Sequence, residues 1–253
     1  MLENKYNNVL VSIITVTFNS DKTLKNTIES IVNQTYKNIE YIIIDGGSTD
    51  ETINIIKKYA QYISYWVSEP DKGIYDAMNK GILKANGNII GIINSDDWYE
   101  KDAIEQMVNS YIINGDNCIY HGNIKFHYKN GDTQLRKPNI DLDNLYKGTI
   151  LFHPTFFVPK IIYKKNGLYN IKFKIAADYD FMVRNYKANT NFIYINRCIS
   201  NMRIEGISAR NAILGYNETK NIAINAHFKK YKIIFFYIIR ILVYKFNKII
   251  HKL

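Results

Sequence analysis

Residues 9–18 have the sequence VLVSIITVTF, and residues 39–44 have the sequence IEYIII, followed by Asp45. Both runs have the length of a strand, are rich in β-branched residues and lack polar alternation, which is typical of central strands in a parallel sheet. Between them, residues 21–34 place apolar side chains at helical spacing and predict a helix. The three segments therefore predict a β-α-β unit.

The same alternation continues through the first half of the chain. We predict helices at residues 51–62, 73–85 and 102–113, and strands at residues 63–67 and 89–93. A chain that alternates strand and helix forms a parallel sheet with helices on both faces and right-handed crossovers. Ligands of such sheets bind beyond the carboxyl ends of the strands. We therefore expect an α/β fold whose functional residues follow the strands.

The second half of the chain is less regular. Residues 119–128 and 133–137 predict a hairpin around Asn130-Gly131. A short helix is expected over residues 176–186 and a strand over residues 191–199. No linker or repeat separates the two halves, so we predict one domain over residues 1–227, followed by a tail over residues 228–253.

The charge of the chain is concentrated in this tail. The 253 residues are 47% apolar and 14% aromatic, which excludes an intrinsically disordered protein. The 33 basic side chains exceed the 23 acidic ones by ten. Seven of the basic residues lie in residues 228–253, a segment without Asp or Glu: Lys229, Lys230, Lys232, Arg240, Lys245, Lys248 and Lys252. The body is therefore nearly neutral, and nucleic acid is not an expected partner.

The tail is apolar over residues 233–246, except at Arg240 and Lys245. This run is shorter than the roughly 20 residues that a membrane-spanning helix needs. We expect a basic amphipathic helix in the membrane interface, with its Lys and Arg side chains reaching anionic headgroups. The alternative is a helix packed on the body of the protein or on a second subunit, which would give a homodimer.

Three further features concern the cellular setting and the core. Cys118 and Cys198 are far apart and fit no metal-ligand spacing, so free buried thiols are expected. Residues 1–8 are polar and lack the apolar core of a signal peptide. These features predict a reducing, cytoplasmic setting. His153 lies in the apolar stretch LFHPTFF and is expected to be a core or turn histidine.

Acidic residues follow two of the predicted strands. Asp45 follows the second strand, and Asp96 and Asp97 follow the fourth. Two adjacent carboxylates repel each other, and a divalent cation such as Mn²⁺ or Mg²⁺ relieves that repulsion. Such a cation keeps open positions for a substrate diphosphate. The alternative is structural, because Ser95 or Asp97 could cap the next helix.

The turn DGGSTD at residues 45–50 allows a close backbone approach at its glycines, and Asp45 can accept hydrogen bonds from a ribose or a base. The turn also resembles the first phosphate loop of the actin and sugar-kinase superfamily. That loop joins two antiparallel strands, whereas a helical pattern follows here. No Gly-x-Gly-x-x-Gly or Walker A pattern occurs, which argues against the common dinucleotide and P-loop sites.

Five motifs occur in order between residues 9 and 208: VSIITVTFNS, IDGGSTD, SEPDKGIYDAMNKGI, GNIIGIINSDDW and AADYDFMVR. Together they resemble family 2 of the glycosyltransferases, most closely the branch that builds bacterial surface polysaccharides such as capsule or lipopolysaccharide. The resemblance implies a GT-A fold, with a nucleotide-binding half over about residues 9–115 and an acceptor-binding half over about residues 116–227.

The resemblance also implies a reaction. It is a metal-dependent, inverting transfer from a nucleotide-diphosphate sugar, with a UDP-sugar as the expected donor. The acceptor is a hydroxyl of a saccharide, and both the resemblance and the basic tail suggest that this saccharide is lipid-linked. We therefore expect a cytoplasmic protein that lies peripherally on the inner face of the cell membrane.

The family pattern assigns the donor-binding residues. Those expected to bind the donor are Thr17, Phe18, Asn19, Asp45, Asp71, Lys72, Asn79, Asn94, Ser95 and Asp96. Among them, Asp45 resembles the acid that contacts the base, with Thr17 to Asn19 as the loop beneath it. Lys72 could meet a phosphate or be a solvated lysine.

The family pattern also assigns the metal ligands and the base. Asp96 resembles the second acid of the DXD motif, which binds the metal, and Asp97 is a second candidate ligand. The first DXD position is Asn94, which departs from the pattern. Asp178 in Ala-Ala-Asp-Tyr-Asp resembles the catalytic base that takes the proton of the acceptor hydroxyl. Asp180 is the alternative base.

Residues 203–208 (RIEGIS) resemble the family's mobile loop, in which Arg203 or Ser208 could touch the diphosphate. Two other functions stay open. One is an actin-type sugar kinase. The other is a catalytically inactive protein that binds a sugar nucleotide or a glycan, against which the intact strand-end acids and Asp178 argue.

Overall fold

A computed structural model of the chain describes residues 9–204 and 211–250, with side chains up to residue 246. Its strands are β1 (Val11–Thr17), β2 (Ile39–Asp45), β3 (Tyr65–Ser68), β4 (Ile89–Asn94), β5 (Trp98–Tyr99), β6 (Cys118–His127), β7 (Thr133–Arg136), β8 (Phe157–Pro159) and β9 (Asn191–Arg203). They form one sheet in the order β3-β2-β1-β4-β8-β6-β9-β5, with β7 beside β6.

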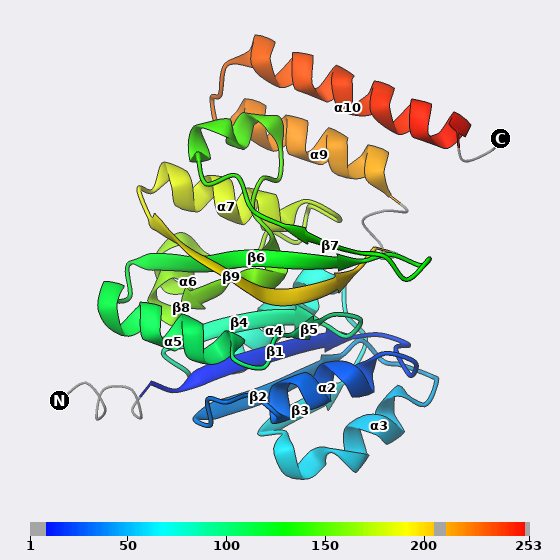
Figure 1. Ribbon diagram of the computed structural model, residues 1–253, viewed down its shortest axis with the longest axis vertical. Coiled ribbons are helices and arrows are strands. Elements are labelled where there is room, and N and C mark those ends of the chain that lie inside the picture. The colour runs from blue at the N-terminus through cyan, green and yellow to red at the C-terminus, as the bar shows by residue number, and fades with distance from the viewer. Residues whose placement is uncertain (1–8, 205–210, 251–253) are drawn as a thin grey trace.

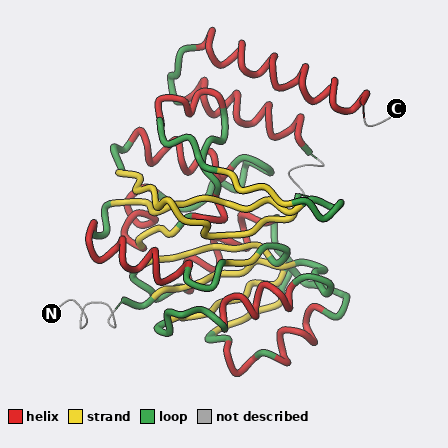
Figure 2. Tube along the Cα trace, viewed as in Figure 1, coloured by secondary structure: helices red, strands yellow, loops and turns green. Residues whose placement is uncertain are grey.

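The α-helices lie on both faces of this sheet (Figure 2). They are α2 (Leu24–Val32), α3 (Thr52–Lys58), α4 (Ile74–Lys84), α5 (Ala103–Asn114), α6 (Lys160–Asn166), α7 (Ala177–Lys187), α9 (Ala212–Asn225) and α10 (Lys230–Ile250). Figure 1 shows α9 and α10 stacked at one end of the molecule, with β2 and β3 near the other end.

The first half forms the predicted parallel sheet. β1 pairs in parallel with β2 and β4, and β2 pairs in parallel with β3. All seven residues of β1 are buried, because its alternate side chains enter two separate cores. Ile14 packs in the core beneath α4, whereas Ile13 packs in the core that contains residues of α2 and α5. The prediction of helices on both faces is therefore confirmed.

This arrangement makes the kinase alternative wrong. A phosphate loop of the actin type would join two antiparallel strands. Here the DGGSTD turn leads from β2 into helix α3. β2 also pairs in parallel with both of its neighbours. The turn therefore begins the crossover of a β-α-β unit that continues through α3 to β3.

The second half extends the sheet with antiparallel strands. β8 is antiparallel to β4 and β6, and β6 forms the predicted hairpin with β7. β9 runs parallel to β6 and continues to Arg203, beyond the predicted end at residue 199. The sequence did not predict β5, β8, α6 or α9. Cys118 on β6 and Cys198 on β9 are free thiols, as predicted, with Cys118 buried and Cys198 partly buried.

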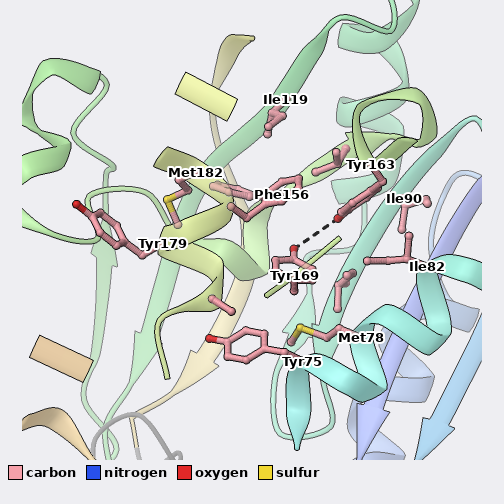
Figure 3. Packing of buried hydrophobic residues seen from close by; sticks show 14 of the residues in the cluster. Tyr75, Met78, Ile82, Ile90, Ile119, Phe156, Tyr163, Tyr169, Tyr179 and Met182 are labelled. Carbon is pink, nitrogen blue, oxygen red and sulfur yellow. Dashed lines mark hydrogen bonds between the residues drawn. The ribbon is translucent and has the colours of Figure 1, made fainter. Parts of the chain in front are cut away.

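The core beneath α4 continues into the second half through a group of buried tyrosines. Figure 3 shows Tyr75 of α4 near Tyr169, whose hydroxyl lies 3.5 Å from that of Tyr163. The Tyr169 hydroxyl also lies 2.9 Å from Nε2 of His153. Burial lowers the pKa of His153 to about 4, so the ring is neutral at physiological pH. The prediction of a core histidine is therefore confirmed.

The C-terminal helix α10 packs on α9 through one face. Ile233 is buried, and the hydroxyl of Tyr237 donates a hydrogen bond to Asn217 of α9 at 2.7 Å. The guanidinium of Arg240 lies 5.3 Å from the centre of the Tyr216 ring and fills the space beside Gly148. The expectation that Arg240 reaches lipid headgroups is therefore wrong, because this side chain points into the protein.

Among the residues that the structure describes, no element covers the opposite face of α10. Its exposed apolar side chains are Tyr231, Ile234, Phe235, Ile238, Ile239, Leu242, Val243 and Phe246, which we call the outer face of α10. Their spacing of three and four residues forms one stripe along the helix. Among the residues that the structure describes, no helix is both long enough and apolar enough to cross a bilayer.

Candidate active site

The carboxyl ends of three parallel strands bring the predicted donor-binding loops together. Thr17 at the end of β1 lies beside Asp45 at the end of β2, and Asn94 ends β4 on the other side of β1. The loops that follow β1 and β4 are joined by the hydroxyls of Ser20 and Ser95, which lie 2.8 Å apart. The predicted cluster at this edge of the sheet is therefore formed.

Asp45 organises the loop that follows it. Its carboxylate is fully buried and accepts hydrogen bonds from the backbone N–H groups of Gly47 at 3.0 Å and Ser48 at 2.8 Å. It also accepts from the hydroxyls of Ser48 at 2.5 Å and Ser68 at 2.7 Å. Because four donors already use this carboxylate, Asp45 shapes the loop that would meet a nucleotide.

The loop after β1 is fixed to the same turn. Asn19 has a left-handed backbone with φ of 48°, its N–H donates to the Ser48 hydroxyl at 2.7 Å, and its side-chain oxygen accepts from the N–H of Thr49 at 2.9 Å. The neighbouring Phe18 ring is 61% exposed and packs beside Gly46. An exposed ring on a well-anchored loop is a surface on which a base could stack.

The signature segment between β3 and α4 contributes Asp71 to this group. A Cβ atom at Gly46 would lie 2.6 Å from Oδ2 of Asp71, so a side chain at Gly46 would displace this carboxylate. The other oxygen of Asp71 accepts from the N–H of Gly73 at 2.7 Å. Lys72 is exposed, and its backbone N–H donates to Asp76 at 3.1 Å. Asp71 therefore lies against the DGGSTD turn, and the exposed Lys72 follows Asp71 in the chain.

Asn79 links α4 to the second half of the chain. Its side-chain N–H donates to the carbonyl of Tyr169 at 2.8 Å, and its oxygen accepts from the Tyr169 N–H at 2.9 Å. Both ends of the amide are thus used to tie α4 to the segment before α7. Asn79 is thus a structural cross-link, and its expected contact with the donor stays a prediction.

Residues 94–97 form a turn in which the N–H of Asp97 donates to the carbonyl of Asn94 at 3.1 Å. Asp97 is 1% exposed, and its Oδ1 accepts from the N–H of Arg203 at 3.2 Å. Burial raises the pKa of Asp96, and burial together with the charge of Asp96 raises the pKa of Asp97 well above its usual range. The positive charge of Arg203 acts in the opposite direction on both groups, but burial outweighs it.

The donor set of this turn fits a hard divalent cation. Oδ1 of Asn94 and Oδ2 of Asp97 are buried oxygens without a hydrogen-bond partner, and Asp96 adds a second carboxylate. Oxygen ligands of this kind suit Mg²⁺ or Mn²⁺. No group of three or more His, Cys, Asp or Glu side chains arranged to hold a metal occurs in the described part of the chain.

Arg203 braces this turn from β9. Its guanidinium donates to the backbone carbonyl of Asp96 at 2.6 Å and lies 4.8 Å from the centre of the Trp98 ring. The proposed contact of Arg203 with a diphosphate therefore competes with two contacts inside the protein. Ser208, the other candidate in that loop, lies outside the described residues.

Asp178 lies in the first turn of α7 and meets the start of α4. The hydroxyl of Tyr75 lies 2.7 Å from the carbonyl of Ile175 and 3.2 Å from Oδ1 of Asp178, and it can donate to either. Burial raises the pKa of Asp178 to about 6, and the charge of Glu218 acts in the same direction. A carboxyl with this pKa can accept a proton near neutral pH. Since α4 begins at the carboxyl edge of the sheet, Tyr75 places Asp178 beside the strand-end loops.

Asp180 is held in an ion pair. Its Oδ2 lies 2.8 Å from Nε of Arg184, one turn along α7. The same guanidinium donates to the carbonyl groups of Asn166 and Leu168. Asp180 thus anchors α7 to the end of α6. The two base candidates therefore differ in their surroundings, because Asp178 accepts from the Tyr75 hydroxyl whereas Asp180 is paired with Arg184.

Sequence reasoning missed two residues of this region. Tyr75 stands in the quoted signature segment, but a tyrosine gives no signal of its partner 103 positions away. Glu218 accepts hydrogen bonds from residues 174–176 and lies on α9, which was not predicted. The apolar and polar residues of α9 alternate too irregularly to predict a helix from the sequence.

The fold and the site define a class of protein. A parallel sheet with acids on its carboxyl edge, extended by antiparallel strands, is the GT-A architecture of nucleotide-sugar transferases. The sequence model of glycosyl transferase family 2 matches residues 12–192. The chain therefore belongs to family 2 of the glycosyltransferases.

Known proteins agree with this assignment. A glycosyltransferase of Mycobacterium tuberculosis, described as uncharacterised, is 34% identical over 178 residues, which cover 69% of this chain and 68% of that protein. A PGL/p-HBAD biosynthesis glycosyltransferase of Mycobacterium bovis is 30% identical over 187 residues, or 69% of each chain.

Among solved structures, S. aureus TarS 1–349 in complex with UDP-GlcNAc has a TM-score of 0.69 at 18% identity, covering 88% of this chain and 69% of that one. In a longer TarS structure, the chain covers 41% of the length, with a TM-score of 0.67 and 19% identity. At this level of identity the likeness to TarS concerns the fold.

Proposed function

We propose that this chain is an inverting glycosyltransferase that moves a sugar from a nucleotide-diphosphate sugar to a hydroxyl of a saccharide acceptor. The observation that carries the proposal is Asp178, a partly buried carboxyl with its pKa raised to about 6. It lies 3.2 Å from the Tyr75 hydroxyl at the start of α4, next to the strand-end loops. A general base for the acceptor hydroxyl needs such a pKa and such a place.

The reaction is a single displacement. Asp178 takes the proton of the acceptor hydroxyl as its oxygen attacks the anomeric carbon. The bond from that carbon to the diphosphate oxygen breaks, and its electron pair leaves with the nucleoside diphosphate. Because attack and departure occur on opposite faces of the sugar and no enzyme nucleophile takes part, the anomeric configuration inverts.

The donor in this proposal is a UDP-sugar. The structural neighbour TarS is seen with UDP and with UDP-GlcNAc, which supports this choice. We assign the base and the ribose to the loops of Thr17, Phe18, Asn19 and Asp45, because Phe18 offers an exposed ring there. Asp71 and Lys72 border the same loops. Ser95 joins them through its hydrogen bond with Ser20.

Asp96 and Asp97 would hold Mn²⁺ or Mg²⁺, with the oxygen of Asn94 as a further ligand. A cation bound there would stabilise the charge that develops on the departing diphosphate. The support for this assignment is the pair of carboxyl groups with raised pKa and the buried oxygens without a partner. Arg203 keeps the turn in place from β9.

The acceptor in this proposal is a lipid-linked saccharide of a surface polysaccharide such as capsule or lipopolysaccharide. The support is the outer face of α10, a stripe of exposed apolar side chains. Lys229, Lys230 and Lys245 are exposed on the same segment, and residues 228–253 contain no acid. Such a surface fits an anionic bilayer on the inner face of the cell membrane. A second copy of α10 fits less well, because its lysines would meet like charges.

The transfer itself is tested with purified protein, a panel of nucleotide sugars and Mn²⁺ or Mg²⁺. We expect one donor to be consumed and the product to have the opposite anomeric configuration by NMR. Asp178→Asn should lower kcat on the order of 10²–10⁴-fold while donor binding, measured by calorimetry, persists. Retention of configuration, or an Asp178→Asn variant with full kcat, would disprove the proposed mechanism. Donor binding without any turnover in the wild type would instead identify an inactive binding protein.

The membrane contact is tested with the full chain and sedimented vesicles of anionic or neutral lipid. Deleting the tail would uncover the core at Ile233, so we choose the substitutions Phe235→Ser, Leu242→Ser and Phe246→Ser. We expect binding to anionic vesicles by the wild type and its loss in this triple variant. Leu83→Ser with Ile113→Ser, two exposed positions elsewhere, is the matched control. Equal vesicle binding by all variants would contradict a lipid partner. So would a wild type and a control variant that are both dimers beside a triple variant that is a monomer.

A further inference from the structure

Glu218 on α9 binds three successive backbone N–H groups just ahead of α7. Its Oε1 accepts from Lys174 at 2.8 Å, and its Oε2 accepts from Ile175 and Ala176 at 2.9 Å each. Ala176 is the N-cap residue of α7 and has no side chain that could cap the helix. A carboxylate supplied by another helix thus satisfies the N–H group of the N-cap residue and those of the two residues before it.

A second contact between α9 and this segment is independent of the first. Gly215 is buried on the same face of α9, one turn before Glu218. A Cβ atom at Gly215 would lie 3.0 Å from a side-chain carbon of Ile175. The absence of a side chain at Gly215 therefore lets α9 approach closely enough for Glu218 to reach the backbone.

The segment held by Glu218 leads directly to Asp178. The carbonyl of Ile175 and the carboxyl of Asp178 share the hydroxyl of Tyr75, at 2.7 Å and 3.2 Å. A shift of Ile175 would change how that hydroxyl divides between the two acceptors. The carboxylate of Glu218 is also a negative charge that acts on Asp178.

We propose that Glu218 is a positioning residue for Asp178, which it fixes by holding residues 174–176 and to which it adds a negative charge. This inference rests on the proposed role of Asp178 as the base. Glu218 lies outside residues 12–192, the part of the chain that the family model matches. The proposed role of Glu218 therefore gives α9 a task in the active site.

Three titratable groups face Asp178 and enter its pH dependence. They are Tyr75 from α4, Tyr169 from the segment before α7, and Glu218 from α9. Burial raises the pKa of both tyrosines well above its usual range, so they are neutral near pH 7. The charge that can change the pKa of Asp178 in this group is therefore that of Glu218.

The test compares the full chain with Glu218→Gln, Glu218→Asp and Asn221→Ala. A glutamine has one acceptor oxygen and would turn an N–H group toward backbone donors, and it removes the charge. Aspartate keeps the charge but is one methylene shorter. Asn221 is exposed on the same helix and serves as the matched control. The readouts are the pKa of Asp178 by ¹³C-carboxyl NMR and the kcat and KM of transfer.

We expect Glu218→Gln to lower the pKa of Asp178, to move the acidic limb of the kcat profile to lower pH, and to reduce kcat about tenfold or more at unchanged donor KM. Glu218→Asp should reduce kcat while the pKa stays close to that of the wild type. It also provides the test if Glu218→Gln does not fold. Asn221→Ala should match the wild type.

An unchanged pKa of Asp178 in Glu218→Gln, or a kcat within twofold of the wild type in both Glu218 variants, would overturn the inference. So would a loss of kcat matched by an equal loss of donor affinity, since that indicates general damage. If the wild type transfers no sugar at all, the proposed function fails. The NMR titration then still decides whether Glu218 acts on Asp178.

Discussion

The strand-end loops and the start of α7 both present aspartates, but in opposite states. Asp45 is fully buried and accepts four hydrogen bonds from the loops around it. Burial raises the pKa of Asp178 to about 6 even though the backbone N–H of Tyr179 and the Tyr75 hydroxyl, at 3.2 Å, favour its ionised form. A saturated carboxylate holds a structure, whereas one whose pKa is raised by burial can exchange a proton. The difference assigns loop shape to the first region and proton transfer to the second.

The largest expected effect concerns the pH dependence of transfer. The base must be ionised, so a pKa of about 6 at Asp178 makes kcat/KM rise with pH through about 6. From pH 7 to pH 4, activity should fall by about 100-fold, or tenfold per pH unit below the pKa. Steady-state rates across this range test it. An acidic limb near pH 4 would remove the contrast between Asp178 and ordinary aspartates.

The second effect concerns Asp45. In Asp45→Asn, an N–H group replaces one oxygen and faces the donors that now bind the carboxylate, and the site is fully buried. We expect the free energy of unfolding to fall by about 2–3 kcal/mol, measured by urea denaturation. Asp116→Asn, at an exposed position, should change it by less than about 0.5 kcal/mol. Equal stability of both variants would show that the hydrogen bonds of Asp45 contribute little.

The third effect is a gain in the free energy of unfolding. At pH 7 the native state holds Asp178 ionised against its tendency to stay protonated, so Asp178→Asn should raise the free energy of unfolding. A shift from 3.8 to about 6 corresponds to about 2 kcal/mol, allowing for partial exposure. The native state binds the proton before the unfolded chain does, so the wild type recovers this stability as the pH falls from 6 to 4.

Urea unfolding of the wild type and Asp178→Asn at pH 7 and pH 4 measures this difference. The advantage of the variant should be present at pH 7 and vanish near pH 4. A variant that is less stable than the wild type at pH 7 would show that the carboxylate of Asp178 is stabilising, like that of Asp45.

The two regions also differ in how far the sequence predicts them. The parallel half has continuous apolar strands and periodic helices, so its fold and the loops of Asp45 and Asn94 follow from local pattern. The second half relies on elements as short as β5 and β8, which have too few residues for any period. Its site depends on distant pairs, such as Tyr75 with Asp178 and Asn79 with Tyr169. No spacing along the chain indicates such pairs.

The smallest expected effect separates the two aspartates of α7. Asp180→Asn breaks the pair with Arg184, whose guanidinium still binds the carbonyl groups of Asn166 and Leu168. We expect the free energy of unfolding to fall by about 1 kcal/mol and kcat to change less than threefold, at an unchanged acidic limb. Arg184→Lys, which keeps the charge but not the fork of donors, should resemble it. A dead Asp180→Asn beside an active Asp178→Asn would reverse the assignment, because the paired carboxylate would then be the one that takes the proton.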